Sequence, residues 1–141
     1  MTYKELTALV MILSGVGIAT WVAWQAMTAP APDVVSVAWR LLYAIGFTIL
    51  INIALMIIAT IVVSIAQRQE LMDERADERD RAINDRSMRN SYFALSFGGL
   101  GVIVALALGQ DPVFTAYALF AVLMIGGLVD PVSRLVYYRI G

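Results

Sequence analysis

The 141-residue sequence contains neither cysteine nor histidine. Without thiols the chain can form no disulfide framework, no thiolate nucleophile and no thiolate zinc site. Without imidazole it lacks the side chain best suited to acid–base chemistry near neutral pH, and the usual ligands of haem and of iron–sulfur clusters are missing too. These absences predict a protein that is not an enzyme and that holds no cofactor and no metal.

Charged residues are also few, and they are unevenly placed. The chain has 10 basic and 11 acidic residues, and 13 of them lie in residues 67–90. The hydrophobic share is 60%, whereas soluble proteins average about 45–50% with glycine included. A domain of this length has too small a core to hide that much apolar surface. The composition therefore excludes a soluble enzyme and a nucleic-acid binder, and it predicts a polytopic membrane protein of the all-α class.

Four stretches are apolar enough to cross a bilayer, which requires about 20 residues for roughly 30 Å of hydrocarbon. The predicted transmembrane helices occupy residues 6–27, 38–66, 91–110 and 112–129. The first stretch is longer than the apolar core of a signal peptide, and only Lys4 precedes it as a basic residue, so we expect it to remain in the protein. The chain is then one integral membrane domain with two short connections and one long, charged connection.

Basic residues near the helix ends predict the orientation. Nine of the ten lie near the chain ends or in residues 67–90, and Arg40 alone lies on the opposite side. Under the positive-inside rule, this asymmetry places both termini and the charged segment in the cytoplasm. Aromatic pairs then fall at the two membrane interfaces, Trp21 with Trp24 outside and Tyr137 with Tyr138 inside.

Two Asp-Pro pairs mark predicted helix starts, because aspartate is a favoured N-cap and proline is favoured at the first helical position. Asp111 and Pro112 should open the fourth helix directly after a tight turn. Asp130 and Pro131 should end that helix and begin a short separate one, since proline interrupts a helix interior. We expect this last helix, over residues 131–140, to lie at the inner membrane surface.

Residues 67–90 are the most unusual part of the chain. They contain six arginines and seven carboxylates and no glycine or proline. Opposite charges recur at spacings of three and four residues, which favours a solvated helix. The pairs are Asp77–Arg81, Glu78–Arg81, Arg81–Asp85 and Asp85–Arg89. We predict a hairpin of two helical arms that turns at residues 83–85, around Asn84; a helix followed by a disordered loop also fits the pattern.

The functional hypothesis for this segment is a docking surface for a protein. Its candidate residues are Asp77, Glu78, Arg79, Asp80 and Arg81. A Mg²⁺ or Ca²⁺ site is an alternative, because Asp73, Asp77 and Asp80 share one helical face and hard cations favour carboxylate oxygens. The interleaved arginines already neutralise these carboxylates, so we predict no metal here. A solvated hairpin without a partner is the simplest interpretation.

A motif within the segment resembles a known family. Residues 76–83, ADERDRAI, are followed by Ser87 and by residues 90–95, NSYFAL, which enter the third predicted span. This pattern resembles small prokaryotic four-span membrane proteins known only as a domain of unknown function, which carry an acidic-Glu-Arg motif ahead of an apolar position. The resemblance covers this segment and the four-span layout. It implies a multi-pass protein of a prokaryote, which we expect in the inner membrane of a bacterium, and it carries over no site residues.

Polar residues inside the predicted spans are sparse. Asn52 lies near the middle of the second span, with Thr48 one turn before it. A buried asparagine usually joins helices through hydrogen bonds, and contact with a transported substrate is the alternative. Small residues at four-residue spacing predict close packing against a neighbouring helix or a second copy of the chain. They form two ladders, Gly15, Ala19 and Ala23 in the first span and Gly101, Ala105 and Gly109 in the third.

Charges at the membrane boundaries are few. Arg40 is expected at the outer boundary, where it snorkels or pairs with Asp33 or Asp111. Asp130 is expected at the inner boundary, with Arg134 four residues on as its partner. No carboxylate or lysine lies at mid-membrane depth, where ion-coupled carriers generally need ionisable groups or unwound helices.

The sequence supports two functional hypotheses. The first is a non-enzymatic interaction or regulatory protein, whose partners are the lipid bilayer and a protein bound at the charged hairpin. The alternative is a small transporter or channel built as a homodimer, with Thr48 and Asn52 along its path. Neither hypothesis involves a nucleic acid or a cofactor.

Overall fold

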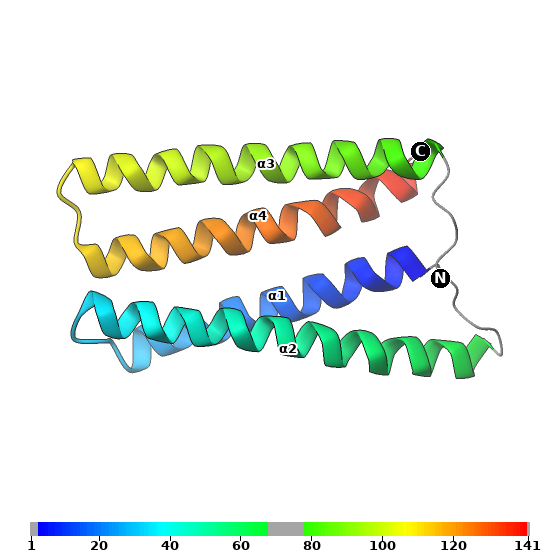
Figure 1. Ribbon diagram of the computed structural model, residues 1–141, viewed down its shortest axis with the longest axis horizontal. Helices are drawn as coiled ribbons and strands as arrows, with labels where there is room; N and C mark the ends of the chain where they lie inside the picture. The colour runs from blue at the N-terminus through cyan, green and yellow to red at the C-terminus, as the bar shows by residue number, and fades with distance from the viewer. Residues whose placement is uncertain (1–2, 68–77, 141) are drawn as a thin grey trace.

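The structure, a computed structural model, describes residues 3–67 and 78–140 and is helical throughout these ranges apart from two short turns (Figure 1). Its four helices are α1 (Tyr3–Thr28), α2 (Val34–Gln67), α3 (Glu78–Ala107) and α4 (Pro112–Ile140). Each helix is long and apolar enough to cross a membrane. The predicted all-α class with four membrane-length helices is therefore confirmed.

The helices run alternately up and down. The α1–α2 and α3–α4 turns lie at one end of the molecule, and α1 and α3 begin at the other end, where α2 and α4 finish (Figure 1). Within the described ranges α1, α2 and α4 all pack against one another, whereas α3 packs against α4 alone. Helix α4 therefore joins α3 to the rest of the bundle.

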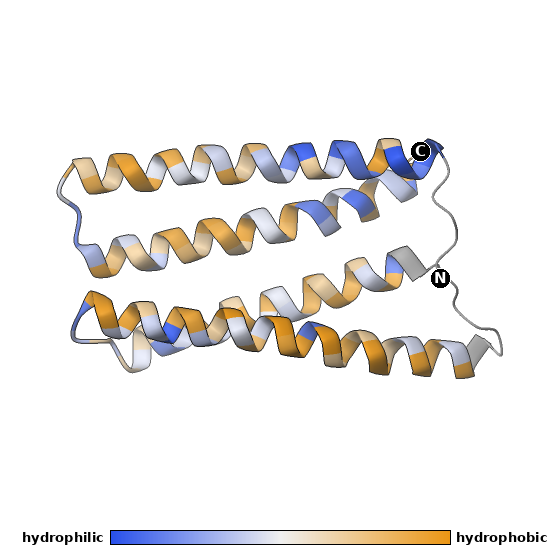
Figure 2. Ribbon diagram, viewed as in Figure 1, coloured by the Kyte–Doolittle hydropathy of each residue, from blue (hydrophilic) through white to orange (hydrophobic). Residues whose placement is uncertain are grey.

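The buried core lies in the half of the bundle that contains the two short turns. Its members come from the three helices that meet there: Ile18 and Val22 of α1, Val37, Leu41 and Ala44 of α2, and Phe120 of α4. Farther along α2, large apolar side chains face outward over residues 47–65, and α3 and α4 are also orange over much of their length in Figure 2. Lipid tails are as apolar as these side chains, so this exterior is compatible with a membrane-spanning bundle.

Local capping contacts explain where α2 and α4 begin. The Asp111 carboxylate accepts a hydrogen bond from the backbone N–H of Phe114 (3.3 Å), and Pro112 is the first residue of α4, as predicted. Asp33 accepts from the N–H of Ser36 (2.7 Å) and caps α2, which therefore begins at Val34 and not at residue 38. Hydrogen bonds from Ser36 hold the pKa of Asp33 below its usual value.

Gly109 forms the end of α3 and the tight turn that follows it. Its φ of 76° is left-handed, a conformation that costs glycine little. The N–H of Gln110 donates to the Ala105 carbonyl oxygen (3.1 Å), and the N–H of Gly109 donates to that of Leu106 (3.0 Å). This is the paired hydrogen-bond pattern of a Schellman C-cap. Gly109 therefore serves the turn and is not a packing residue of the predicted ladder.

The predicted turn at residues 83–85 is wrong. Helix α3 runs without interruption from Glu78 to Ala107, so the charged residues 78–90 extend the third apolar helix. Ile83 and Ser87 are buried along this extension, which shows that one of its faces is covered rather than solvated. Residues 68–77 of the predicted hairpin lie outside the described residues.

The predicted helix break at Pro131 is also wrong. Helix α4 continues through this residue to Ile140, so residues 131–140 form no separate helix. Proline removes one backbone hydrogen bond and crowds the preceding turn, but tertiary contacts can hold a membrane helix together around it. Here Pro131 is fully buried, and the long α3 provides packing and hydrogen bonds along the end of α4.

Candidate docking surface and intramembrane polar contacts

Polar side chains bind the charged part of α3 to the end of α4. The Asn90 amide donates to the hydroxyls of Tyr137 (3.0 Å) and Ser133 (3.3 Å). Nearer the start of α3, the Tyr138 hydroxyl donates to the Asp80 carboxylate (2.8 Å). The two tyrosines predicted to mark the inner interface thus hold the α3 extension in place.

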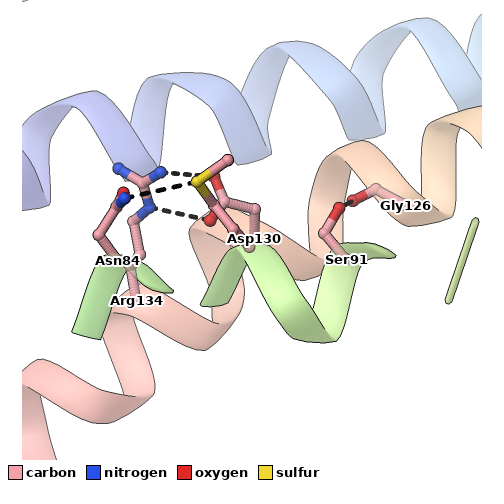
Figure 3. Close-up of polar contacts among 6 residues, drawn as sticks. Asn84, Ser91, Gly126, Asp130 and Arg134 are labelled. Carbon is pink, nitrogen blue, oxygen red and sulfur yellow. Dashed lines mark hydrogen bonds and ion pairs between the residues drawn. The ribbon is translucent and has the colours of Figure 1, made fainter. Parts of the chain in front are cut away.

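Farther along the same helix pair, the Ser91 hydroxyl donates to the carbonyl oxygen of Gly126 (2.5 Å), as Figure 3 shows. Asn84 lies on the same side of α3 and donates to the Met88 sulfur (3.4 Å). Polar contacts therefore continue along α3 for several turns, although only the bonds to α4 hold the two helices together.

Asp130 and Arg134 form the ion pair that their spacing predicts. Two guanidinium nitrogens, Nε and Nη2, each lie 2.9 Å from a different carboxylate oxygen (Figure 3). Such two-point geometry is the strongest form of an arginine–carboxylate contact. The charge of Arg134 is thereby compensated within α4.

The exposed charges of the α3 extension have no such ion-pair partner among the described residues. All four of its arginines are exposed, as are Glu78 and Asp85. Among the described residues, none of the predicted pairs Glu78–Arg81, Arg81–Asp85 and Asp85–Arg89 closes to an ion pair. An exposed pair on a helix gains only about 0.2–0.5 kcal/mol and loses side-chain freedom when it forms. The arginines therefore remain available to a partner.

The five docking candidates do not all occupy one surface. Glu78, Arg79 and Arg81 are exposed in the first turn of α3. Asp80 is partly buried and turned toward Tyr138 of α4, which makes it a structural contact. Asp77 lies outside the described residues. Of the four candidates that the structure describes, three therefore share an exposed position at the start of α3.

Asn52 joins α2 to α1. Its amide oxygen accepts a hydrogen bond from the Ser14 hydroxyl (2.8 Å), and its nitrogen donates to the Thr48 carbonyl oxygen (3.0 Å). The Thr48 hydroxyl donates within its own helix, to the Ala44 carbonyl oxygen (2.8 Å). Asn52 also lines an apolar groove of about 330 Å³ between α1 and α2. These contacts fit the helix-joining interpretation of Asn52.

Ser14 is a polar contact that the sequence analysis missed. It is buried, and its partner is 38 residues away along the chain. The available signal was its position beside Gly15, in a turn of α1 that carries the small-residue ladder. Serine is common at close helix contacts in membranes, both because it is small and because its hydroxyl bonds across the interface.

In the small-residue ladder of α1, Gly15 packs against a neighbouring helix as predicted, whereas Gly101 of the α3 ladder meets no neighbouring helix in the bundle. A Cβ added to Gly15 would lie 2.8 Å from the Leu128 side chain of α4, whereas Gly101 has open space around it. Among the glycines of α3, the close contact is instead made by Gly98, where a Cβ would lie 2.6 Å from Val122. Spacing alone did not reveal which of the glycines faces α4.

Arg40 uses a backbone partner. Its guanidinium donates to the carbonyl oxygen of Ala29 (2.7 Å) in the turn before α2. Among the described side chains, it forms no ion pair with Asp33 or Asp111. The contact places its charge at the end of the bundle, in agreement with the predicted boundary position.

The described residues contain no group of three acidic side chains that could hold a metal ion. Asp73 and Asp77, two members of the alternative metal triad, lie outside these residues. Comparison with known proteins adds no assignment, since no family model matches the chain and no curated protein or solved structure is detectably similar to it.

Proposed function

We propose that the chain is a non-enzymatic, multi-pass protein of a bacterial inner membrane that docks a cytoplasmic protein through the start of α3. The observation that carries this proposal is the exposure of Glu78, Arg79 and Arg81, which form no ion pair among the described residues, on a helix that is bonded to α4. Both termini lie in the cytoplasm in this proposal, because nine of the ten basic residues belong to that side.

The length of α3 sets the height of this surface above the membrane. About 20 residues span the hydrocarbon layer. If the span is counted back from Gly109, its inner end falls at Asn90. The hydrogen bond between Asn90 and Ser133 puts this level close to Asp130, where about 20 residues counted from Pro112 also end. The two helices therefore give the same inner boundary.

The start of α3 extends well past that boundary. At 1.5 Å per residue, Glu78 lies about 18 Å beyond Asn90. The headgroup layer is only about 5–8 Å thick on each side. Glu78, Arg79 and Arg81 would thus stand in the aqueous phase, within reach of a soluble protein.

The alternative, a homodimeric transporter or channel, has less support from the geometry. Asn52 and Thr48 would have to contact the substrate, but Asn52 bonds to Ser14 and the Thr48 hydroxyl bonds within α2. The resemblance to small prokaryotic four-span proteins of unknown function is likewise our proposal, and it rests on the motif in residues 76–95.

The proposal is tested by crosslinking in native membranes followed by affinity purification. Arg79→Glu combined with Arg81→Glu should abolish recovery of a specific partner that the wild-type protein captures. Arg139→Glu is the control, because this exposed arginine lies at the same end of the bundle but belongs to α4 and not to the start of α3. Asp80 is left unchanged since its loss would also release Tyr138. Identical partners from the wild type and the double variant would refute docking at this surface.

A further inference from the structure

We propose that Arg86 and Arg89 bind the phosphate of an anionic phospholipid in the inner leaflet. This inference rests on the membrane placement proposed above but not on the docking of a protein. The relevant side chains form a strip along one side of α3, with two arginines followed by two phenylalanines. The strip comprises Arg86, Arg89, Phe93 and Phe97, all of which are exposed.

The first argument is height. Arg89 and Arg86 lie one and four residues outside Asn90, or about 1.5 and 6 Å beyond the hydrocarbon boundary. Both distances fall within a headgroup layer of about 5–8 Å. Arg79 and Arg81 lie about 14–16 Å beyond the same boundary, which is too far to meet the phosphates. The arginines of α3 thus divide into a lipid-level pair and an aqueous pair.

The second argument is charge. Neither Arg86 nor Arg89 has an ion-pair partner among the described residues, although Asp85 is one position from the first and four from the second. Arg134 lies at a similar level but is compensated by Asp130. A guanidinium group at the edge of the hydrocarbon benefits strongly from an anion, and its planar donors match a phosphate in two-point geometry. The two unpaired arginines therefore favour an anionic phospholipid, in which no headgroup amine neutralises the charge of the phosphate.

The third argument identifies a lipid rather than a free phosphate. Phe93 follows Arg89 by four residues and Arg86 by seven, so it lies on the same side of the helix. Its ring stacks on that of Phe97 at a centroid distance of 6.4 Å, and these side chains are 50% and 71% exposed. On the hydrocarbon side of the arginines, the two phenylalanines of the strip thus offer apolar surface to an acyl chain. A ligand with a charged head and an apolar tail fits both parts.

The experiment is native mass spectrometry of the full-length protein in detergent, titrated with phosphatidylglycerol and, separately, with phosphatidylcholine. A basic residue near the membrane surface contributes roughly five-fold to the affinity for anionic lipid. Arg86→Gln with Arg89→Gln should therefore weaken the first phosphatidylglycerol site by about ten-fold or more. Arg79→Gln with Arg81→Gln removes the same charge from the aqueous pair and should change the affinity by less than two-fold.

Two further arms make the outcome specific. Arg86→Lys with Arg89→Lys keeps the charge but loses the two-point geometry, and it should bind with intermediate affinity. Millimolar inorganic phosphate should not displace the lipid, because it cannot use the phenylalanine surface. Equal weakening in both glutamine variants, no preference over phosphatidylcholine, or displacement by phosphate would each overturn the proposal. Any of these results would leave protein docking at Arg79 and Arg81 standing, since that surface is assayed separately.

Discussion

Replacing Gly98 with alanine should destabilise the bundle, because this residue lies directly against Val122 of α4. An added Cβ would stand 2.6 and 2.8 Å from the two Val122 methyl carbons, whereas carbon atoms make favourable contact at about 3.5–4.0 Å. Valine in a helix has essentially one rotamer, so these methyls cannot swing aside. The helices must move apart, and such overpacking costs about 1–3 kcal/mol.

The free energy of unfolding can be measured by circular dichroism as sodium dodecyl sulfate is titrated into mixed micelles. Gly101→Ala is the matched control, since it lies in the same helix with nothing within 4 Å of its added Cβ. It should not destabilise, and the higher helix propensity of alanine could add up to about 1 kcal/mol. Val122→Ala removes the obstructing methyls, so Gly98→Ala should cost clearly less in that background.

Equal unfolding free energies for the Gly98→Ala and Gly101→Ala proteins would refute the assigned packing of α3 on α4. The same conclusion would follow if Val122→Ala failed to reduce the cost of Gly98→Ala. A lower stability of Gly101→Ala alone would mean that its face of α3 is the packed one.

Three other predictions concern polar groups. Asn52→Leu removes the α1–α2 hydrogen bond to Ser14 and should lower the unfolding free energy by about 0.6–1.7 kcal/mol; the detergent titration measures this, and an unchanged midpoint would contradict it. Arg134→Gln breaks a partly exposed ion pair with Asp130 and should cost about 0.5–1 kcal/mol in the same assay, with a smaller effect at high salt; a neutral result would show that the pair is not stabilising. Because folding lowers the pKa of Asp33, the ionised carboxylate stabilises the folded protein at pH values above the unfolded pKa, near 3.8. This contribution is lost as the pH falls through the lower pKa of the folded state. Asp33→Asn should abolish that part of the acid dependence below about pH 5. Unfolding measured at a series of pH values checks this, and a pH dependence equal to that of the wild type would contradict it.

Local features of the chain predict the four helices and some of their ends. Apolar stretches of membrane length became the apolar parts of α1 to α4, because length and hydropathy are properties of consecutive residues. The cap at Asp111 and the ion pair from Asp130 to Arg134 were also correct. Each involves residues within four positions of one another, so helix geometry alone brings them together.

The errors concern residues whose conformation depends on another helix. The predicted break at Pro131 was reasonable for an isolated helix, but α4 continues because a long α3 covers it. The predicted turn near Asn84 failed for the reciprocal reason, since Ile83 and Ser87 are buried and keep the α3 extension straight. In both cases the residues nearby in sequence do not indicate that another helix will cover the segment.

The helical class, the number of apolar helices and the concentration of charge at one end follow from composition and from the order of residues along the chain. The folded bundle was needed to show that Gly98 rather than Gly101 meets α4, and that Ser14 is the partner of Asn52. Packing also decides which charges are compensated: Arg134 pairs with Asp130, whereas Arg86 and Arg89 have no ion-pair partner among the described residues. Spacing shows which residues share a face, but the neighbouring helix that a face meets is set by packing between distant segments.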